Sequence, residues 1–249
     1  MTVGNFQEAL FSGRMYNQGL FEESKTQKHP LGFVRPLEDG REFVYALNGA
    51  VALSPGRLLQ VAVPIPNHLG MGVAAVAAIG DKRVYVTPGA TDMAANAYKD
   101  GFIHINTSTG VGYSYKVRGH KAITGLSSGY IELYDSLRAA LDTASKATIT
   151  KQPADSVIVF PTSQTGAPAG ATHSAVTIGY HFWMQVKGPV AMLTHGTLAI
   201  GNTVMPSVGL AGAISPETVG GAITCVVGSV LRVNADTFHS LINLNIPGY

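Results

Sequence analysis

Glycine punctuates this chain, and its spacing constrains the fold more than any other feature. The 249 residues include 29 glycines, roughly 12% against about 7% in average proteins. Between them lie short runs rich in valine, leucine and aromatic residues, such as 41–47, 57–63 and 82–87. Runs of this length that end in turn formers are typical of β-strands, and many of them at close spacing predict a barrel or a sandwich.

Turn signals and one helical pattern complete the expected fold. Asp39-Gly40 and Asn48-Gly49 are dipeptides that favour tight hairpins. Residues 134–146 are the best helix candidate, because apolar residues recur there with helical spacing. We therefore predict a mainly β protein: a β-barrel or β-sandwich body of short antiparallel strands, with an extended N-terminal arm and at most one short helix.

The chain divides into three parts on this pattern. Residues 1–31 show no clear period and are expected to form the arm, residues 32–150 a first β section, and residues 151–249 a C-terminal barrel-like section. An extended arm cannot bury its own aromatic side chains, so it needs a partner surface. The interface candidates in this arm are Phe6, Phe11, Tyr16 and Phe21.

Charge is distributed unevenly, which bears on assembly. Residues 1–45 hold eleven charged side chains, whereas residues 156–231 hold only Lys187 and Glu217. Surfaces of soluble domains normally carry about 25–35% charge, so this stretch predicts a face hidden in a homo-oligomer. The alternative is a monomeric β core with serine, threonine and asparagine on its outside. The candidates for core or interface here are Phe182, Met184 and Met192, with Trp183 assigned to the core.

Composition argues against several classes of function. The net charge is +2 without a lysine and arginine cluster, which argues against a nucleic-acid partner. The sequence shows neither a secretory signal nor a run of apolar residues long enough for a membrane helix, so we expect no membrane partner. Cys225 is the single cysteine, and the eight histidines form no ligand motif, so no metal is expected.

A cofactor is not expected either. Residues 70–75 match the loose dinucleotide-binding pattern, which needs a strand before it and a helix after it. Pro64 and Pro66 break the approach, and Gly80-Asp81 ends any helix within about two turns. The pattern indicates a flexible connection.

A serine hydrolase is the alternative function from a different class, that of enzymes. Residues 125–129 match the G-x-S-x-G motif, with Ser127 as the nucleophile and Asp155 and His173 in the right order behind it. The motif needs a helix directly after its second glycine, whereas residues 130–134 form a β-like run. A glycine and serine turn is the favoured interpretation, and no catalytic residue is assigned.

From Tyr180 the sequence resembles a known family. An aromatic cluster, then Gln185-Val-Lys-Gly188, an apolar triplet and a glycine turn are similar to the C-terminal part of head decoration, or cement, proteins of tailed phages. The pattern continues at 198–204, 209–214 and 228–233. Residues 27–32, 39–45 and 49–56 resemble the N-terminal part of virion structural proteins from such phages, whereas 65–130 match less clearly.

The resemblance implies a function as well as a fold. It implies a non-enzymatic protein, often a trimer, that binds the outside of an icosahedral head and bridges neighbouring capsomers. Its partner would be the major capsid protein of the same virion, and its place the capsid surface after assembly in the host cytoplasm. A major capsid, tail or baseplate protein would share the composition and is the nearest alternative.

Overall fold

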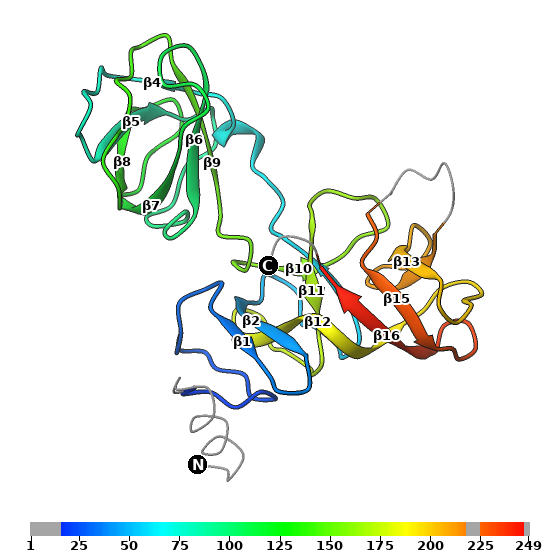
Figure 1. The fold of residues 1–249 in the computed structure, drawn as a ribbon. Helices are drawn as coiled ribbons and strands as arrows, with labels where there is room; N and C mark the ends of the chain where they lie inside the picture. Colours follow the sequence, from blue (N-terminus) through cyan, green and yellow to red (C-terminus); the bar gives the residue numbers. More distant parts are fainter. Residues whose placement is uncertain (1–15, 218–224, 247–249) are drawn as a thin grey trace. The chain divides into compact units, whose positions relative to one another are not determined.

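The fold was obtained as a computed structural model, which describes residues 16–217 and 225–246 (Figure 1). The predicted fold class is confirmed: among the described residues strands make up 41% and helix 1%, and the strand pairs are antiparallel. Within the described ranges, the one helical turn is η1 (Pro66–His68). Phe6 and Phe11 lie outside the described residues.

The chain forms two compact units. Unit 1 consists of residues Met1–Ala62 and Pro153–Tyr249, and unit 2 of residues Val63–Gln152. Unit 2 is therefore an insertion in the sequence of unit 1. This differs from the predicted division into residues 32–150 and 151–249, because residues 32–62 belong with the C-terminal part.

Unit 1 is built on one antiparallel sheet of ten strands. Its strands are β1 (Val34–Pro36), β2 (Glu42–Leu47), β3 (Leu58–Gln60), β10 (Ile158–Val159), β11 (Pro168–Ala171), β12 (His181–Leu193), β13 (Thr203–Pro206), β14 (Ile214–Pro216), β15 (Gly228–Arg232) and β16 (His239–Asn245). The main path runs β10-β3-β11-β12-β16-β15-β13-β14, and β2 joins it by pairing with β12. Buried leucine, valine, methionine and phenylalanine side chains from these strands form its main core.

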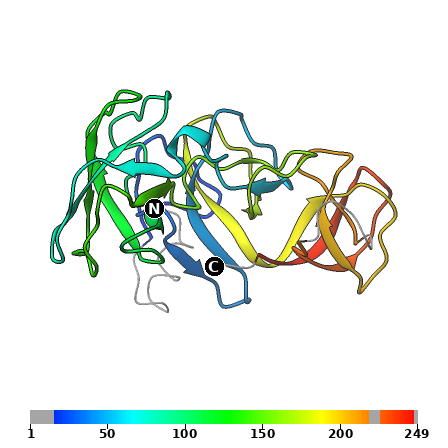
Figure 2. The same cartoon turned by 90° about the horizontal axis from the view of Figure 1, so that it is seen from above.

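Strand β12 organises this sheet because it changes partner along its length. Residues 181–187 pair with β2, and residues 187–193 pair with β16. Figure 2 shows β12 in yellow, with the blue β2 along its first half and the red β16 along its second half.

A bulge marks the point where β12 changes partner. The register shifts between Gln185 and Lys187, and Gly188 follows with φ +87°, a conformation that favours glycine. The buried Gln185 amide donates to the carbonyls of Lys187, Gly188 and Pro189 at 3.0, 3.2 and 3.0 Å. The Gln-Val-x-Gly motif of the resemblance therefore has a structural task in this chain, which is to bend the central strand.

Unit 2 is a closed six-stranded barrel with the strand order β4-β5-β8-β7-β6-β9. Its strands are β4 (Met71–Val73), β5 (Arg83–Thr87), β6 (Phe102–Thr107), β7 (Ser114–His120), β8 (Gly129–Leu133) and β9 (Lys146–Thr150). Buried and exposed positions alternate along β5, β6 and β7, as expected for strands with one face in a core. Closure leaves the barrel without a free strand edge.

The two predicted hairpins have different outcomes. Residues 38–41 do form the turn between β1 and β2, where Pro36 lies opposite Glu42, and Gly40 takes φ +83°. Asn48-Gly49 does not close a hairpin. Asn48 instead bridges Val157 in parallel, and the Gly49 amide donates to the Val157 carbonyl at 2.9 Å.

The predicted helix at 134–146 is wrong. Leu137 and Leu141 are both buried in the barrel core, but their backbones bond to the loop between β4 and β5. The Leu137 amide donates to the Asp81 carbonyl and the Leu141 amide to the Ala77 carbonyl, both at 2.8 Å. These amides are then unavailable for helical bonds, so the i, i+4 spacing reflects two leucines that fill the barrel core from an irregular loop.

Candidate interaction surfaces

Residues 16–31 pack on their own chain in unit 1 rather than forming a free arm. There Tyr16 joins Phe43, Tyr45 and Trp183 in an aromatic cluster, and partly buried leucine and phenylalanine side chains pack around it. Tyr16 is buried, and its ring meets the Trp183 ring edge-on at 5.7 Å. We expected Tyr16 to pack on a partner, and this expectation is corrected. The side chain is buried by its own chain, beside β2 and β12.

Gln18 is the polar centre of this packing. Its backbone carbonyl accepts hydrogen bonds from Arg35 Nη1 at 3.1 Å and from Trp183 Nε1 at 3.2 Å. Its side-chain oxygen accepts from the Tyr45 hydroxyl at 2.8 Å, and its amide nitrogen donates to the His181 carbonyl at 3.0 Å. Buried polar groups are costly without such partners, so Gln18 fixes the position of the segment on the sheet.

Arg35 is fully buried within the same cluster. Its guanidinium carbon lies 4.4 Å from the centre of the Tyr16 ring and 5.3 Å from that of Trp183. Burial lowers its pKa to about 10, so the side chain stays protonated at neutral pH. The aromatic faces and the Gln18 carbonyl together stabilise this cation.

Three histidines bind the backbone of residues 16–31. His29 Nε2 accepts from the Asn17 amide at 3.1 Å, His173 Nε2 lies 2.6 Å from the Leu20 carbonyl, and His181 Nδ1 lies 3.2 Å from the Ser24 carbonyl. Burial lowers the pKa of all three, and for His173 the nearby Arg41 and Arg35 act in the same direction. The neutral forms are therefore favoured in the folded unit.

The other interface candidates divide into buried and exposed residues. Phe182, Met184 and Met192 were predicted to lie in the core or at an interface, and they are buried in the main core of unit 1. Trp183 is buried as well, as predicted. Phe21 is 67% exposed. Its ring lies 4.8 Å from that of His173, and it is available to a partner.

An uncharged sheet face is the main exposed surface that the candidates missed. We call it the uncharged face and define it by five uncharged outward residues of β12, β15 and β16, beside which Lys187, Arg232 and His239 also point outward. The five are Pro189, Ala191, Ser229, Leu241 and Asn243. Asn243 lies opposite both Pro189 and Ser229, and Leu241 lies opposite both Ala191 and Arg232. Period-two alternation in 187–193 and 239–245 was the signal that could have identified it.

Large apolar side chains are also exposed on the connections of unit 1. After residue 153 those that are at least one third exposed on connections are Ile178, Ile200, Val208, Val226, Val233 and Phe238. Lys187, at one end of the uncharged face, pairs with Glu42 at 2.9 Å. Exposed apolar groups in a region nearly free of charge are a feature of interaction surfaces.

The barrel of unit 2 presents a different kind of surface. On its outside, Tyr85 of β5 lies opposite Tyr130 of β8, and Arg83 opposite Glu132. The two tyrosine rings are 5.9 Å apart, Arg83 lies 4.6 Å from the centre of the Tyr130 ring, and its Nη2 pairs with Glu132 at 2.9 Å. We call these four residues the tyrosine quartet.

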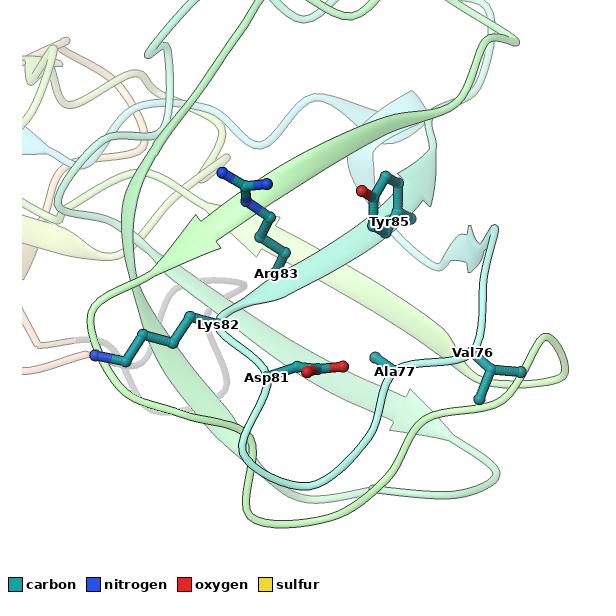
Figure 3. A pocket seen from close by; sticks show the side chains of 6 residues that line it. All are labelled: Val76, Ala77, Asp81, Lys82, Arg83 and Tyr85. Carbon is teal, nitrogen blue, oxygen red and sulfur yellow. The ribbon is translucent and has the colours of Figure 1, made fainter.

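Two hollows of about 330 Å³ each lie beside the quartet. The first is formed by the start of β5 and the loop before it, and Figure 3 shows Arg83 and Tyr85 above Asp81 and Ala77. The second, which we call the basic hollow, lies toward β7. Its lining residues are Asn96, Lys99, Arg118, Gly119, His120, Lys121, Tyr130 and Glu132.

A buried polar cluster lies inside the barrel near the basic hollow. His68 Nδ1 lies 2.5 Å from the Tyr98 hydroxyl, and its Nε2 lies 3.1 Å from the Thr91 carbonyl. The Tyr98 amide donates to His120 Nε2 at 3.3 Å. Burial raises the pKa of Tyr98 to about 12 and lowers that of His120. These contacts tie the segment before β6 to β7.

The two sequence motifs occupy ordinary structural positions. Residues 70–75 run through strand β4 of the barrel. Ser127 lies in a turn in which its amide donates to the Thr124 carbonyl at 3.0 Å. Its proposed partners Asp155 and His173 belong to unit 1, and His173 Nε2 is engaged with Leu20.

Among residues 16–217 and 225–246, no three histidine, cysteine, aspartate or glutamate side chains gather closely enough to hold a metal ion. The described part of the chain contains no helix with the length and apolar character needed to cross a membrane.

No protein-family model, no curated protein and no solved structure matches the chain.

Proposed function

We propose that this protein is a non-enzymatic structural component of a tailed-phage virion. In this role it binds the outer surface of the head as a homo-oligomer, a trimer, and bridges neighbouring copies of the major capsid protein. The sequence resemblance to head decoration proteins supports the class of function, and the surface of unit 1 supports the mode of binding.

The observation that carries the proposal is the character of unit 1 between residues 156 and 231. That stretch holds only two charged residues, yet it exposes Ile178, Ile200 and Val208 and contributes Pro189 and Ala191 to the uncharged face. Burying apolar area stabilises a complex by roughly 25 cal/mol per Å². Repeated over a symmetric shell, modest contacts of this kind sum to firm attachment.

Phe21 is a further candidate contact on the N-terminal side of unit 1. It follows the segment that Gln18 anchors, and its ring is exposed. In the proposed complex Phe21 contacts a neighbouring subunit or the shell, as the sequence predicts.

The direct test is electron microscopy of purified particles with and without the protein. The proposal expects additional density on the outside of the head that disappears when the gene is deleted and returns when purified protein is added. Density confined to the tail or baseplate, or unchanged heads, would reject it. Labelling by a fluorophosphonate probe that depends on Ser127 would instead support a hydrolase.

Oligomeric state gives a second test of the same proposal. Sedimentation velocity at micromolar protein should show a species larger than the 26.1 kDa chain, and a trimer is the expected mass. Substituting Leu241 and Ala191 by glutamate should dissociate it if the uncharged face forms the subunit contact, because buried unpaired charge is strongly unfavourable. A monomer in the unmodified protein would contradict the oligomer.

A further inference from the structure

The basic hollow of the barrel has the chemistry of a ligand site that the virion role does not require. We propose that the basic hollow and the adjoining tyrosine quartet bind an acidic oligosaccharide, a sugar chain whose rings carry carboxylates. The proposal concerns unit 2 alone and stands whether or not the protein decorates a phage head.

Unpaired positive charge is the first argument. Lys99, Arg118 and Lys121 are exposed around the hollow, and in the described part of the chain none of them takes part in a salt bridge. Unit 2 contains nine basic and six acidic residues, a net charge of +3, whereas unit 1 contains eight and nine, a net charge of −1. Cations gathered around a concavity attract anions, and the arginine fork matches a carboxylate.

Exposed aromatic rings are the second argument. Tyr85 is 39% exposed and lies across from Tyr130, which lines the hollow. The C–H bonds on one face of a sugar ring carry partial positive charge and pack well on the negative face of an aromatic ring. The same ring in an acidic sugar places its carboxylate at the edge, within reach of the cations.

The remaining polar groups distinguish a sugar from a nucleic acid. Glu132 uses Oε1 for its bonds to Arg83, and its Oε2 has no hydrogen-bond partner among the described residues. That oxygen can accept from a sugar hydroxyl, a donor that an oligosaccharide carries on every ring and that a DNA backbone lacks. A volume of about 330 Å³ falls at the small end of ligand pockets, which suits one or two sugar rings.

Titration of the full-length chain with defined sugars tests the proposal. The probes are oligogalacturonate, oligomannuronate and sialyllactose, with neutral dextran, poly-L-glutamate and single-stranded DNA as comparisons. We expect at least one acidic sugar to bind at millimolar concentration or below, with NMR shifts at residues 96–99, 118–121 and 130–132. Added NaCl should weaken this binding because it screens exposed charge.

Matched variants then locate the site. K99Q/R118Q should weaken binding at least about tenfold, since each lost charged contact is worth about that factor, and Y130A should also weaken it. R138Q/K146Q removes the same charge at two residues that do not line the hollow, and Lys146 lies on β9, opposite β8 in the ring of strands. This control should bind as the unmodified protein does. K121Q, at an exposed position, replaces the double variant if that variant does not fold.

Three results would overturn the proposal. The first is that none of the acidic sugars binds, and the second is that K99Q/R118Q or K121Q binds as well as the control. The third is that poly-L-glutamate or DNA binds at least as tightly as the sugars and Y130A has no effect, which would show a general polyanion surface.

Discussion

The sheet of unit 1 and the barrel of unit 2 differ most at their surfaces. Unit 1 exposes an uncharged face and several large apolar side chains, whereas the outside of the barrel carries tyrosines, lysines and arginines. Apolar contact is nearly independent of salt, but contact through exposed charge is not. One chain thus offers two surfaces suited to two kinds of partner.

The two units also differ in how the sequence builds them. Every barrel strand comes from the continuous segment Val63–Gln152, whereas the central pairing of unit 1 joins Tyr45 to Trp183. Separate cores serve the two units. We therefore expect unit 2 to unfold independently of unit 1 and to fold faster, because its contacts are more local.

The largest expected effect comes from core truncation in each unit. Phe43 in the aromatic cluster and Ile131 in the barrel core are both fully buried. F43A should destabilise unit 1 by about 3–5 kcal/mol and I131A should destabilise unit 2 by about 2–5 kcal/mol. Trp183 is the one tryptophan of the chain and lies in unit 1, so its fluorescence follows that unit during denaturation.

Only F43A should shift the fluorescence midpoint, while calorimetry should show the I131A transition moving separately. If I131A shifts the Trp183 signal as much as F43A does, the two units unfold as one and the comparison fails.

The next effect concerns the N-terminal segment. Deleting residues 1–25 removes Gln18 and leaves Trp183 Nε1 and the Tyr45 hydroxyl without their acceptor, at about 1–3 kcal/mol for each buried group. Deleting residues 1–15 keeps Gln18 and its hydrogen bonds and serves as the control. By Trp183 fluorescence, the longer deletion should unfold at clearly lower denaturant than the shorter one. Equal stability of the two would show that Gln18 does not anchor the segment.

A smaller effect is expected from pH. Burial lowers the pKa of His29, His173 and His181 in unit 1, and of His120 in unit 2. Histidines that are harder to protonate in the folded state contribute stability above their unfolded pKa of about 6.5, and this stability is lost as the pH falls toward the lowered values. Unit 1 should therefore lose more stability than unit 2 between neutral pH and pH about 5.

The substitution H173Q should reduce the pH dependence of unit 1 in Trp183-monitored unfolding and leave that of unit 2 unchanged. An equal loss in both units on acidification would contradict the assignment.

The sequence predicted the class of fold because local signals determine it. The strand-like run at 82–87 and the turn at Asp39-Gly40 depend on neighbouring residues, and both appear in the structure. The helix prediction failed because Leu137 and Leu141 follow the helical period while their amides bond to Asp81 and Ala77. Periodicity alone cannot reveal a distant acceptor.

The surfaces were harder to predict than the fold. Low charge in 156–231 indicated an interaction region, but not that Phe182, Met184 and Met192 face inward while Pro189 and Ala191 face out. The bulge at Gln185 and Gly188 interrupts the regular alternation of inward and outward side chains along β12. The basic hollow was missed because Lys99 is distant in sequence from Arg118 and Lys121, and they meet only where the segment before β6 bonds to β7.

We propose that unit 1 holds the protein on a phage head by apolar contact. Purified particles carrying the protein should be washed in ~1 M NaCl at neutral pH, where the Debye length is only about 3 Å, and then pelleted. We expect the protein to stay with the particles and to leave them only on heating or in denaturant. Release into the supernatant by salt alone would show that charge dominates the attachment and would contradict attachment by apolar contact.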